Sequence, residues 1–205
     1  MSVQHRPAGI YSVRSGDGIV FLDLGTDSYS CIYRQDHDED ATSPANRTAP
    51  AILCGTEDVP PSRRWQERDE DEPVACRLAD IVLFLRALVS ALATFPGRDV
   101  RTLLEKIHRS RPALRFDRPQ MAALVARRFE TLWLFLPFRG KCLFRSFVLL
   151  HYLRLYGLGA DWIFGVSLFP FSAHCWLASN DLLIGERAHR IGQYEVIFSS
   201  NRSII

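Results

Sequence analysis

The 205-residue sequence predicts an α+β fold, in which a small β-meander precedes a helical block and a second set of antiparallel strands. Three observations support this. Short β-forming segments alternate with Gly-containing turns over the first 33 residues, the middle of the chain has helical periodicity, and apolar strands joined by a hairpin follow it. An apolar fraction of 47% is enough for a substantial core.

The meander consists of three segments, 9–14, 19–24 and 28–33. The turns Gly16-Asp17-Gly18 and Gly25-Thr26-Asp27 join them. Three strands of this length are not stable alone, so we expect them to pack on other structure.

Three helices are expected in the block that follows. A third helix starts at Asp117, has Pro119 in its first turn, and runs to about Leu136. We expect all three apolar stripes to be core and the aromatic residues Trp133 and Phe135 to pack under the next helix. The first stripe, which Pro96-Gly97 ends, comprises Leu78, Ile81, Val82, Leu85, Leu88, Val89 and Leu92, and the second comprises Val100, Leu103, Leu104 and Ile107.

A fourth helix is predicted between Gly140 and Gly157, with Cys142 in its first turn. The free backbone N–H groups and the positive dipole end of a helix stabilise a thiolate there, and Lys141 adds a cation. The sequence therefore predicts a lowered pKa for Cys142, as a nucleophile needs. The alternative is that Cys142 is a small buried apolar residue.

Two strands, 160–169 and 172–178, come next, and a loop at 179–181 leads to a returning strand at 182–186. With a period of two, His174 and Trp176 share one face of the second strand, and Cys175 lies on the other. A three-residue loop places His174 opposite Glu186, with the two Cβ atoms about 5 Å apart. Asp181, the other candidate acid, is at the loop tip and too far along an extended chain.

A helix-start Cys, an Ala-His-Cys-Trp strand and a hairpin acid, in that order, resemble the transglutaminase-like cysteine peptidases. The resemblance is closer to the leader-peptidase B proteins of lasso-peptide biosynthesis. Its residues are Cys142, Gly165-Val166, the Pro-Phe-Ser-Ala-His-Cys-Trp segment at 170–176, and Glu186, so it covers about the last third of the chain. The sequence departs from the family where Glu186 replaces the usual Asp and Cys175 replaces a small residue.

The resemblance implies a cysteine endopeptidase in which Cys142 attacks a peptide bond, His174 transfers the proton and Glu186 orients His174. The implied substrate is the leader of a ribosomally made lasso precursor, and an asparagine-synthetase-like macrolactam cyclase is the implied partner. ATP would act through that cyclase, because Gly16 and Gly18 lack the Lys-Ser/Thr of a P-loop and no cofactor is expected on this chain.

The resemblance also divides the chain. Residues 1–72 are expected to form a winged-helix-like leader-recognition domain, and residues 73–205 a transglutaminase/papain-like peptidase domain. The leader would add to the strand at 28–33, with Tyr29, Cys31 and Tyr33 on one face as peptide-binding residues. Helices are expected within 36–68, chiefly around 49–54, and the charged run 66–72 is expected to be a linker.

Composition narrows the functional classes. Five cysteines in no metal-binding pattern favour a reducing, bacterial cytoplasm over secretion, and His108, His151 and His189 have no ligand-spaced partners, so no metal site is expected. Neither a signal peptide nor a membrane span is visible. Residues 1–72 have 7 Lys/Arg and 14 Asp/Glu, and residues 73–205 have 18 and 9, but the basic residues are scattered, which argues against nucleic-acid binding.

Two other functions fit the same residues. An acyltransferase would pass the acyl group on Cys142 to an amine instead of water. A non-catalytic scaffold would bind the leader and would have lost the triad at the change from Asp to Glu186.

Overall fold

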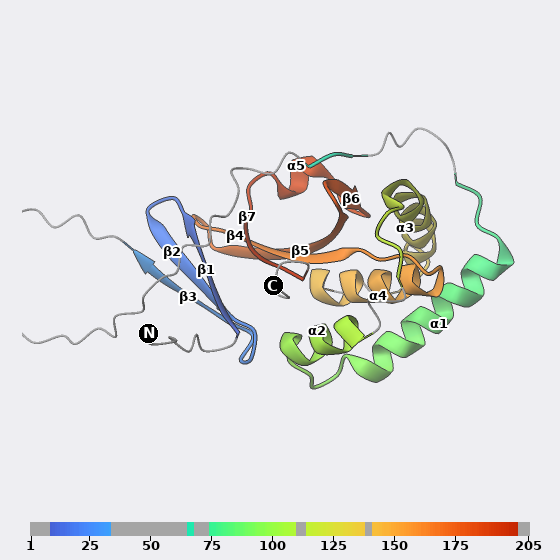
Figure 1. The fold of residues 1–205 in the computed structure, drawn as a ribbon, viewed down its shortest axis with the longest axis horizontal. Coiled ribbons are helices and arrows are strands. Elements are labelled where there is room, and N and C mark those ends of the chain that lie inside the picture. Colours follow the sequence, from blue (N-terminus) through green and yellow to red (C-terminus); the bar gives the residue numbers. More distant parts are fainter. Residues whose placement is uncertain (1–8, 34–64, 68–73, 110–113, 138–140, 201–205) are drawn as a thin grey trace, which may run out of the picture.

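A computed structural model describes residues 9–33, 65–67, 74–109, 114–137 and 141–200 (Figure 1). Two antiparallel sheets and a layer of helices build the fold. In chain order the elements are β1 (Ile10–Ser15), β2 (Gly18–Asp23), β3 (Ser28–Tyr33), α1 (Leu78–Thr94), α2 (Val100–Arg109), α3 (Pro119–Trp133), α4 (Cys142–Leu155), β4 (Asp161–Ser167), β5 (Ser172–Ser179), β6 (Leu182–Ile184), α5 (Ala188–Ile191) and β7 (Glu195–Ser199).

The N-terminal sheet has the strand order β1-β2-β3, and all three predicted strands are confirmed. It packs against the rest of the described structure, where the ring of Tyr11 on β1 lies 4.7 Å from that of Phe198 on β7. Its buried residues Val13, Val20 and Leu22 belong to the same hydrophobic cluster as the helices and β4. The sheet is therefore stabilised by the structure it packs on, as its short strands require.

The division of the chain at residue 72 stays a prediction, because residues 68–73 lie outside the described residues. Most of the segment 36–68, in which helices were expected, also lies outside the described residues. Its described part, 65–67, is extended and not helical. Gln66 forms a parallel bridge with Leu182 of β6, and its N–H donates to the carbonyl of Asp181 at 2.8 Å. Part of the expected linker is thus attached to the edge of the second sheet.

The second sheet has the order β6-β5-β4-β7. Helix α4 covers one face, between that sheet and α1, and α5 covers the other (Figure 1). Helix α4 is buried nearly all round, which explains why its sequence is largely apolar, with Arg145 and Arg154 as its charged residues. Helix α5 and strand β7 were not predicted from the sequence. Strand β7 completes this sheet, and α5 packs on it.

The hairpin between β5 and β6 differs from its prediction by one residue. Ala178 pairs with Leu183 instead of Leu182, so the loop has two residues, Asn180 and Asp181, and β6 ends at Ile184. Asn180 supplies the positive φ, 56°, that a tight two-residue turn requires. The predicted ladder pairing of His174 with Glu186 is therefore wrong.

Helix α1 buries the opposite face from the predicted one. Phe84, Ala87 and Ala91 pack inward, where Phe84 contacts the rings of Phe129 and Tyr152. Of the stripe predicted to be core, only Leu88 is buried, and Leu78, Ile81, Val82, Leu85, Val89 and Leu92 are exposed. Both faces of α1 are apolar, so periodicity alone does not choose between them, and the aromatic face wins because it fits the cluster on α3 and α4.

Two further expectations about the helical block have clear outcomes. Trp133 packs near Phe144 of α4, with ring centroids 6.3 Å apart, as expected. Phe135 does not pack under α4, since it lies beyond the end of α3 and is 81% exposed. No helix within the described ranges is long and apolar enough to cross a membrane.

Candidate active site

Cys142 is the first residue of α4 and lies half-buried beside β5. Its pKa is lowered to about 4, first by a hydrogen bond with the Cys175 thiol and then by His174 and the backbone N–H of Cys175. Burial opposes this shift but is outweighed. The cation that stabilises the thiolate is His174, whereas the sequence had suggested Lys141. Cys142 is thus held as a thiolate near neutral pH.

His174 lies on β5, with its ring stacked near Trp176 and tilted against Tyr194. Its pKa is raised to about 9, first by the hydrogen bond with Cys142 and then by that with Glu186. The Nε2 atom is 3.0 Å from Oε2 of Glu186. Because Glu186 occupies Nε2, the ring offers Nδ1 to the Cys142 sulfur. Between about pH 4 and pH 9 the two residues form a thiolate–imidazolium pair.

Glu186 is held as a carboxylate. Burial alone would raise its pKa, but the hydrogen bonds from His174 and from the Arg187 N–H outweigh burial, and the pKa is below its ordinary value. Its side chain is only 7% exposed. A buried carboxylate on Nε2 fixes the imidazole tautomer and stabilises its cation.

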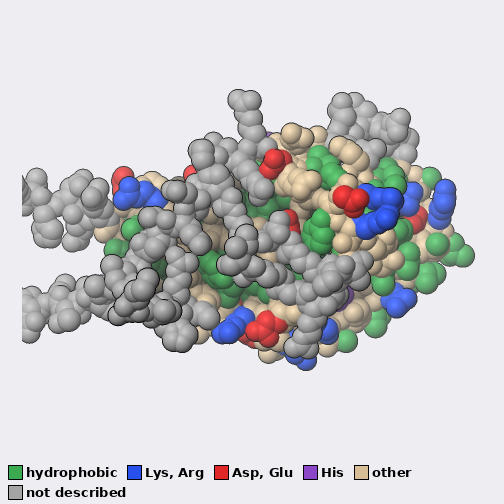
Figure 2. All heavy atoms as spheres, viewed as in Figure 1, with side chains coloured by type: hydrophobic (Ala, Val, Ile, Leu, Met, Phe, Trp, Pro, Cys, Tyr) green, Lys and Arg blue, Asp and Glu red, His purple; other side chains and the backbone are tan. Residues whose placement is uncertain are grey.

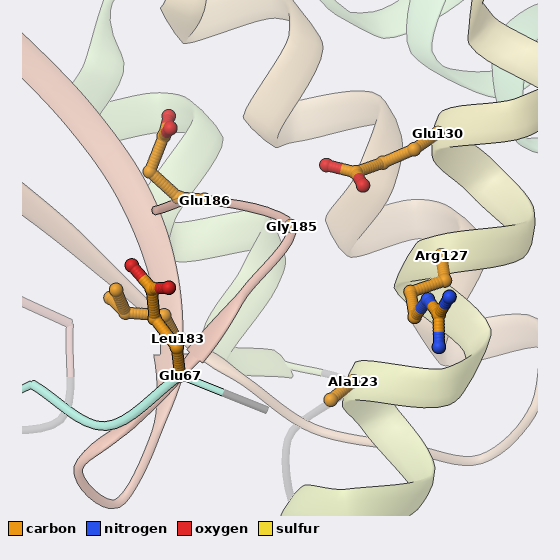
Figure 3. Close-up of a pocket in the computed structure, with 7 residues that line it drawn as sticks. All are labelled: Glu67, Ala123, Arg127, Glu130, Leu183, Gly185 and Glu186. Atoms are coloured by element: carbon orange, nitrogen blue, oxygen red, sulfur yellow. The ribbon is translucent and has the colours of Figure 1, made fainter. Parts of the chain in front are cut away.

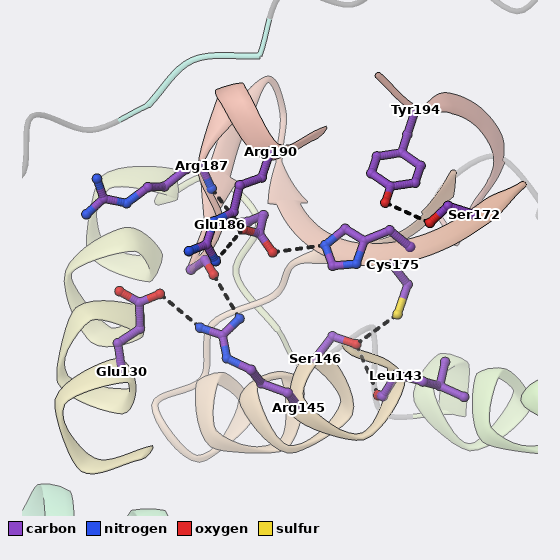
Figure 4. A network of polar contacts seen from close by, with 12 residues as sticks. Glu130, Leu143, Arg145, Ser146, Ser172, Cys175, Glu186, Arg187, Arg190 and Tyr194 are labelled. Atoms are coloured by element: carbon purple, nitrogen blue, oxygen red, sulfur yellow. Dashed lines mark hydrogen bonds and ion pairs between the residues drawn. The ribbon is translucent and has the colours of Figure 1, made fainter. Parts of the chain in front are cut away.

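Glu186 reaches His174 through a turn, because the β5–β6 ladder ends two residues before it. Gly185 has φ +69°, and a Cβ there would lie 2.8 Å from the Leu149 side chain, so glycine is required. Arg145 of α4 donates from Nη1 to the Gly185 carbonyl at 3.2 Å and from Nη2 to Glu130 at 3.0 Å (Figure 4). The helix that begins with the nucleophile therefore also holds the turn that carries the acid.

Arg145 is a site residue that the sequence analysis missed. Its one signal is its position three residues after Cys142, on the same face of the helix. Asp181, the alternative acid, lies in the hairpin loop, where its carbonyl accepts the Gln66 N–H. The carboxylate that the structure places on His174 belongs to Glu186.

Cys175 has the opposite character to Cys142. The alternation predicted that it lies on the opposite face of β5 from His174. In the structure that face is toward α4, where the sulfur is 3.4 Å from Oγ of Ser146. The neighbouring Cys142 thiolate, and then burial, raise the pKa of Cys175 well above its ordinary value. Cys175 is thus a neutral thiol that donates to Cys142.

Two small cavities meet at Glu186. One is lined by residues that include Cys142, His174, Cys175 and Glu186. The other lies between α3 and β6, and Figure 3 shows Glu130 of α3 extending toward Gly185 and Glu186 across it, with Arg127 on the same helix. Within the described part of the chain, no group of three or more His, Cys, Asp or Glu side chains is placed to hold a metal ion.

The three predicted peptide-binding residues lie along β3, beside the turn between β4 and β5. The ring of Tyr29 is 5.6 Å from that of Phe171, and the ring of Tyr33 is 5.7 Å from that of Phe169. Cys31 is half-buried between them on the same face. Burial, followed by the charges that Cys175 and Cys142 can carry, raises the pKa of Tyr29 to about 12, so β3 reaches the surroundings of the nucleophile.

Comparison with known proteins agrees with this geometry at the level of the superfamily. No curated protein and no solved structure matches the chain. The sequence profile described as "Transglutaminase-like superfamily" matches residues 82–199, which run from the first turns of α1 to the end of β7 and include the Cys142, His174 and Glu186 cluster. Because the match spans more than half of the chain, this protein belongs to the transglutaminase-like superfamily.

Proposed function

We propose that this chain is a cysteine endopeptidase that cuts the leader from a ribosomally made lasso-peptide precursor. The observation that carries the proposal is the thiolate–imidazolium pair of Cys142 and His174, with the Glu186 carboxylate 3.0 Å from the far imidazole nitrogen. Superfamily membership supports thiol chemistry on an acyl group, by peptidase or acyltransferase. The order of the residues and the motif at 170–176 favour the leader peptidase.

The geometry suggests a reaction in two steps, acylation of Cys142 followed by hydrolysis of the thioester. The Cys142 thiolate attacks the carbonyl carbon of the scissile bond, and backbone N–H groups at the start of α4 are candidate donors to the oxyanion. His174 donates its Nδ1 proton to the leaving amine, which departs and leaves a thioester on Cys142. Water then attacks the thioester and gives one proton to His174. The other proton stays on the carboxylic acid product, which is released together with the Cys142 thiolate.

The N-terminal sheet suggests how a peptide is held. Among the described residues, β3 is an edge strand, so its outer backbone groups are open to an added strand. The aromatic contacts of Tyr29 and Tyr33 connect β3 to the turn that leads into β5, the strand of His174. A leader bound along β3 would therefore place the following residues near Cys142.

The partner and the role of ATP are part of the same proposal. An asparagine-synthetase-like cyclase would join the new α-amine of the core to a side-chain carboxylate, and would use ATP in doing so. Such coupling explains why no nucleotide-binding motif is needed on this chain.

The test is to incubate the purified chain with the full precursor, with and without the cyclase and ATP, and to analyse the products by mass spectrometry. Without the cyclase, a peptidase gives free leader and linear core, and the two masses sum to the precursor plus one water. With the cyclase and ATP, the core is one water lighter because the macrolactam has formed. An acyltransferase gives an amide with an added amine, and a scaffold gives no product. Cys142→Ala is the negative control, and loss of cleavage there with unchanged leader binding is expected.

A further inference from the structure

Helix α1 is apolar on two opposite faces. One face packs on α3 and α4, and the other presents Leu78, Val82, Leu85, Val89 and Leu92, which are 48–77% exposed. The helix has 17 residues, of which only Asp80 and Arg86 are charged, and Asp80 is buried. Figure 2 shows the corresponding hydrophobic side chains at the lower right, where α1 lies. A helix that is apolar all round is typical of one covered on both sides.

The spacing of the exposed stripe identifies what kind of element covers it. Successive members are four, three, four and three residues apart, which is the heptad spacing of a helix that packs lengthwise against another helix. Valine occupies both a positions and leucine all three d positions. This choice favours a two-stranded, parallel pair of helices of like sequence. We infer that α1 is the interface through which two copies of this chain associate, with their α1 helices side by side about a two-fold axis.

The size of the stripe supports a second copy as the occupant. Together with Ile81, the stripe exposes roughly 600 Å² per protomer, so two protomers bury at most about 1,200 Å², which reaches the lower end of the range for stable interfaces. The stripe carries no charge that would select an acidic or basic partner. In a parallel pair, Arg86 at a flanking position lies opposite Ile81 of the second copy, so the two Arg86 side chains are kept apart.

Self-association through α1 does not depend on the proposed function. Helix α4 lies between α1 and β5, so the interface is separated from His174 by the core (Figure 1). Dimer formation would leave the edge of β3 open.

The test measures the mass of the full chain in solution by light scattering and sedimentation, from about 1 to 100 µM. We expect about twice the 23.4 kDa chain mass at the upper end. A double variant, Leu85→Glu with Val89→Glu, is expected to be monomeric with an unchanged circular dichroism spectrum, because both side chains are exposed in the single chain. Leu134→Glu is the matched control, since Leu134 is 83% exposed but lies on α3's C-terminal cap, and it is expected to stay dimeric.

Cross-linking tests the orientation. In a parallel pair, Leu78→Cys and Leu92→Cys each cross-link to their own copies, beyond the background of the parent chain with its five cysteines. Cross-linking only in a mixture of the two variants would overturn the parallel arrangement. A wild-type chain that is monomeric throughout, or a dimer that survives the double variant, would overturn the proposal and assign the stripe to another protein or to another part of this chain.

Discussion

Replacing Glu186 by Gln tests the part of the site on which the reasoning depends most. Contacts with Cys142 first and Glu186 second raise the pKa of His174 from 6.5 to about 9. At about 1.4 kcal/mol per pKa unit, the shift corresponds to about 3 kcal/mol. Burial lowers the pKa of His174, so the two contacts together contribute more than this net shift. Glu186 is the smaller contributor, and losing its charge costs on the order of 1–2 kcal/mol, or roughly tenfold in rate.

The tautomer adds a larger effect. The Glu186 carboxylate keeps a proton on Nε2 of His174, and a neutral Gln side chain does not. In the variant, His174 can therefore be a neutral imidazole with its proton on Nδ1. That form is not the cation that the leaving amine needs. The comparable substitution in a serine triad costs ~10⁴ in kcat, and we therefore expect a loss of about 10²–10⁴-fold for Glu186→Gln.

The pH profile should change in a defined direction. The active pair forms above the pKa of Cys142, about 4, and is lost above the pKa of His174, about 9. Removing the carboxylate destabilises the imidazolium, so the upper limb moves to lower pH, and the weaker cation lets the lower limb move to higher pH. The bell-shaped profile of kcat/KM should therefore narrow from both sides.

Two assays check this prediction. Precursor cleavage followed by chromatography gives kcat, and the rate of iodoacetamide labelling of Cys142 against pH gives the thiolate fraction without any substrate. Asp181→Asn is the matched control and should be close to wild type in both. A crippled Asp181→Asn together with a nearly wild-type Glu186→Gln would refute the assignment of the acid.

Three further changes test other contacts. Cys175→Ala removes the hydrogen bond that contributes most to the low pKa of Cys142. Iodoacetamide labelling of Cys142 should therefore become slower below about pH 6. Unchanged labelling below about pH 6 would contradict the contact between Cys142 and Cys175. Arg145→Ala releases the carbonyl of Gly185 and should lower kcat about 10–100-fold with little change in KM. Arg145→Lys should restore part of the lost kcat. A change in KM alone would argue against a positioning role for Arg145. Tyr33→Ala removes the contact of β3 with the β4–β5 turn and should weaken binding of a fluorescent leader peptide. The rate at which iodoacetamide labels Cys142 should not change. Undiminished leader affinity would exclude this part of β3 from docking.

The sequence by itself determined the elements that depend on local patterns. The three strands of the first sheet and the start of α4 at Cys142 follow from turn residues, helix breakers and periodicity. The alternation on β5 correctly separated His174 from Cys175. Turn residues, helix breakers and periodicity each involve only a few neighbouring residues, so a short segment of sequence is enough to predict these elements.

Only the tertiary structure decided the rest. The β5–β6 pairing differs by one residue from the prediction because a two-residue and a three-residue loop are both compatible with the sequence. Glu186 nevertheless reaches His174, because Gly185 turns the chain and Arg145 holds its carbonyl. The hydrogen bond between Arg145 and the Gly185 carbonyl joins residues 40 positions apart, and no local pattern encodes it.

Helix α1 shows the same limit for packing. Its periodicity correctly predicted a helix, but two apolar stripes compete for the core. The stripe with Phe84 is inside because the aromatic rings of Phe129 and Tyr152 are there to receive it. Which face of a doubly apolar helix is buried depends on the shape of its neighbours, and neighbours are a property of the folded chain.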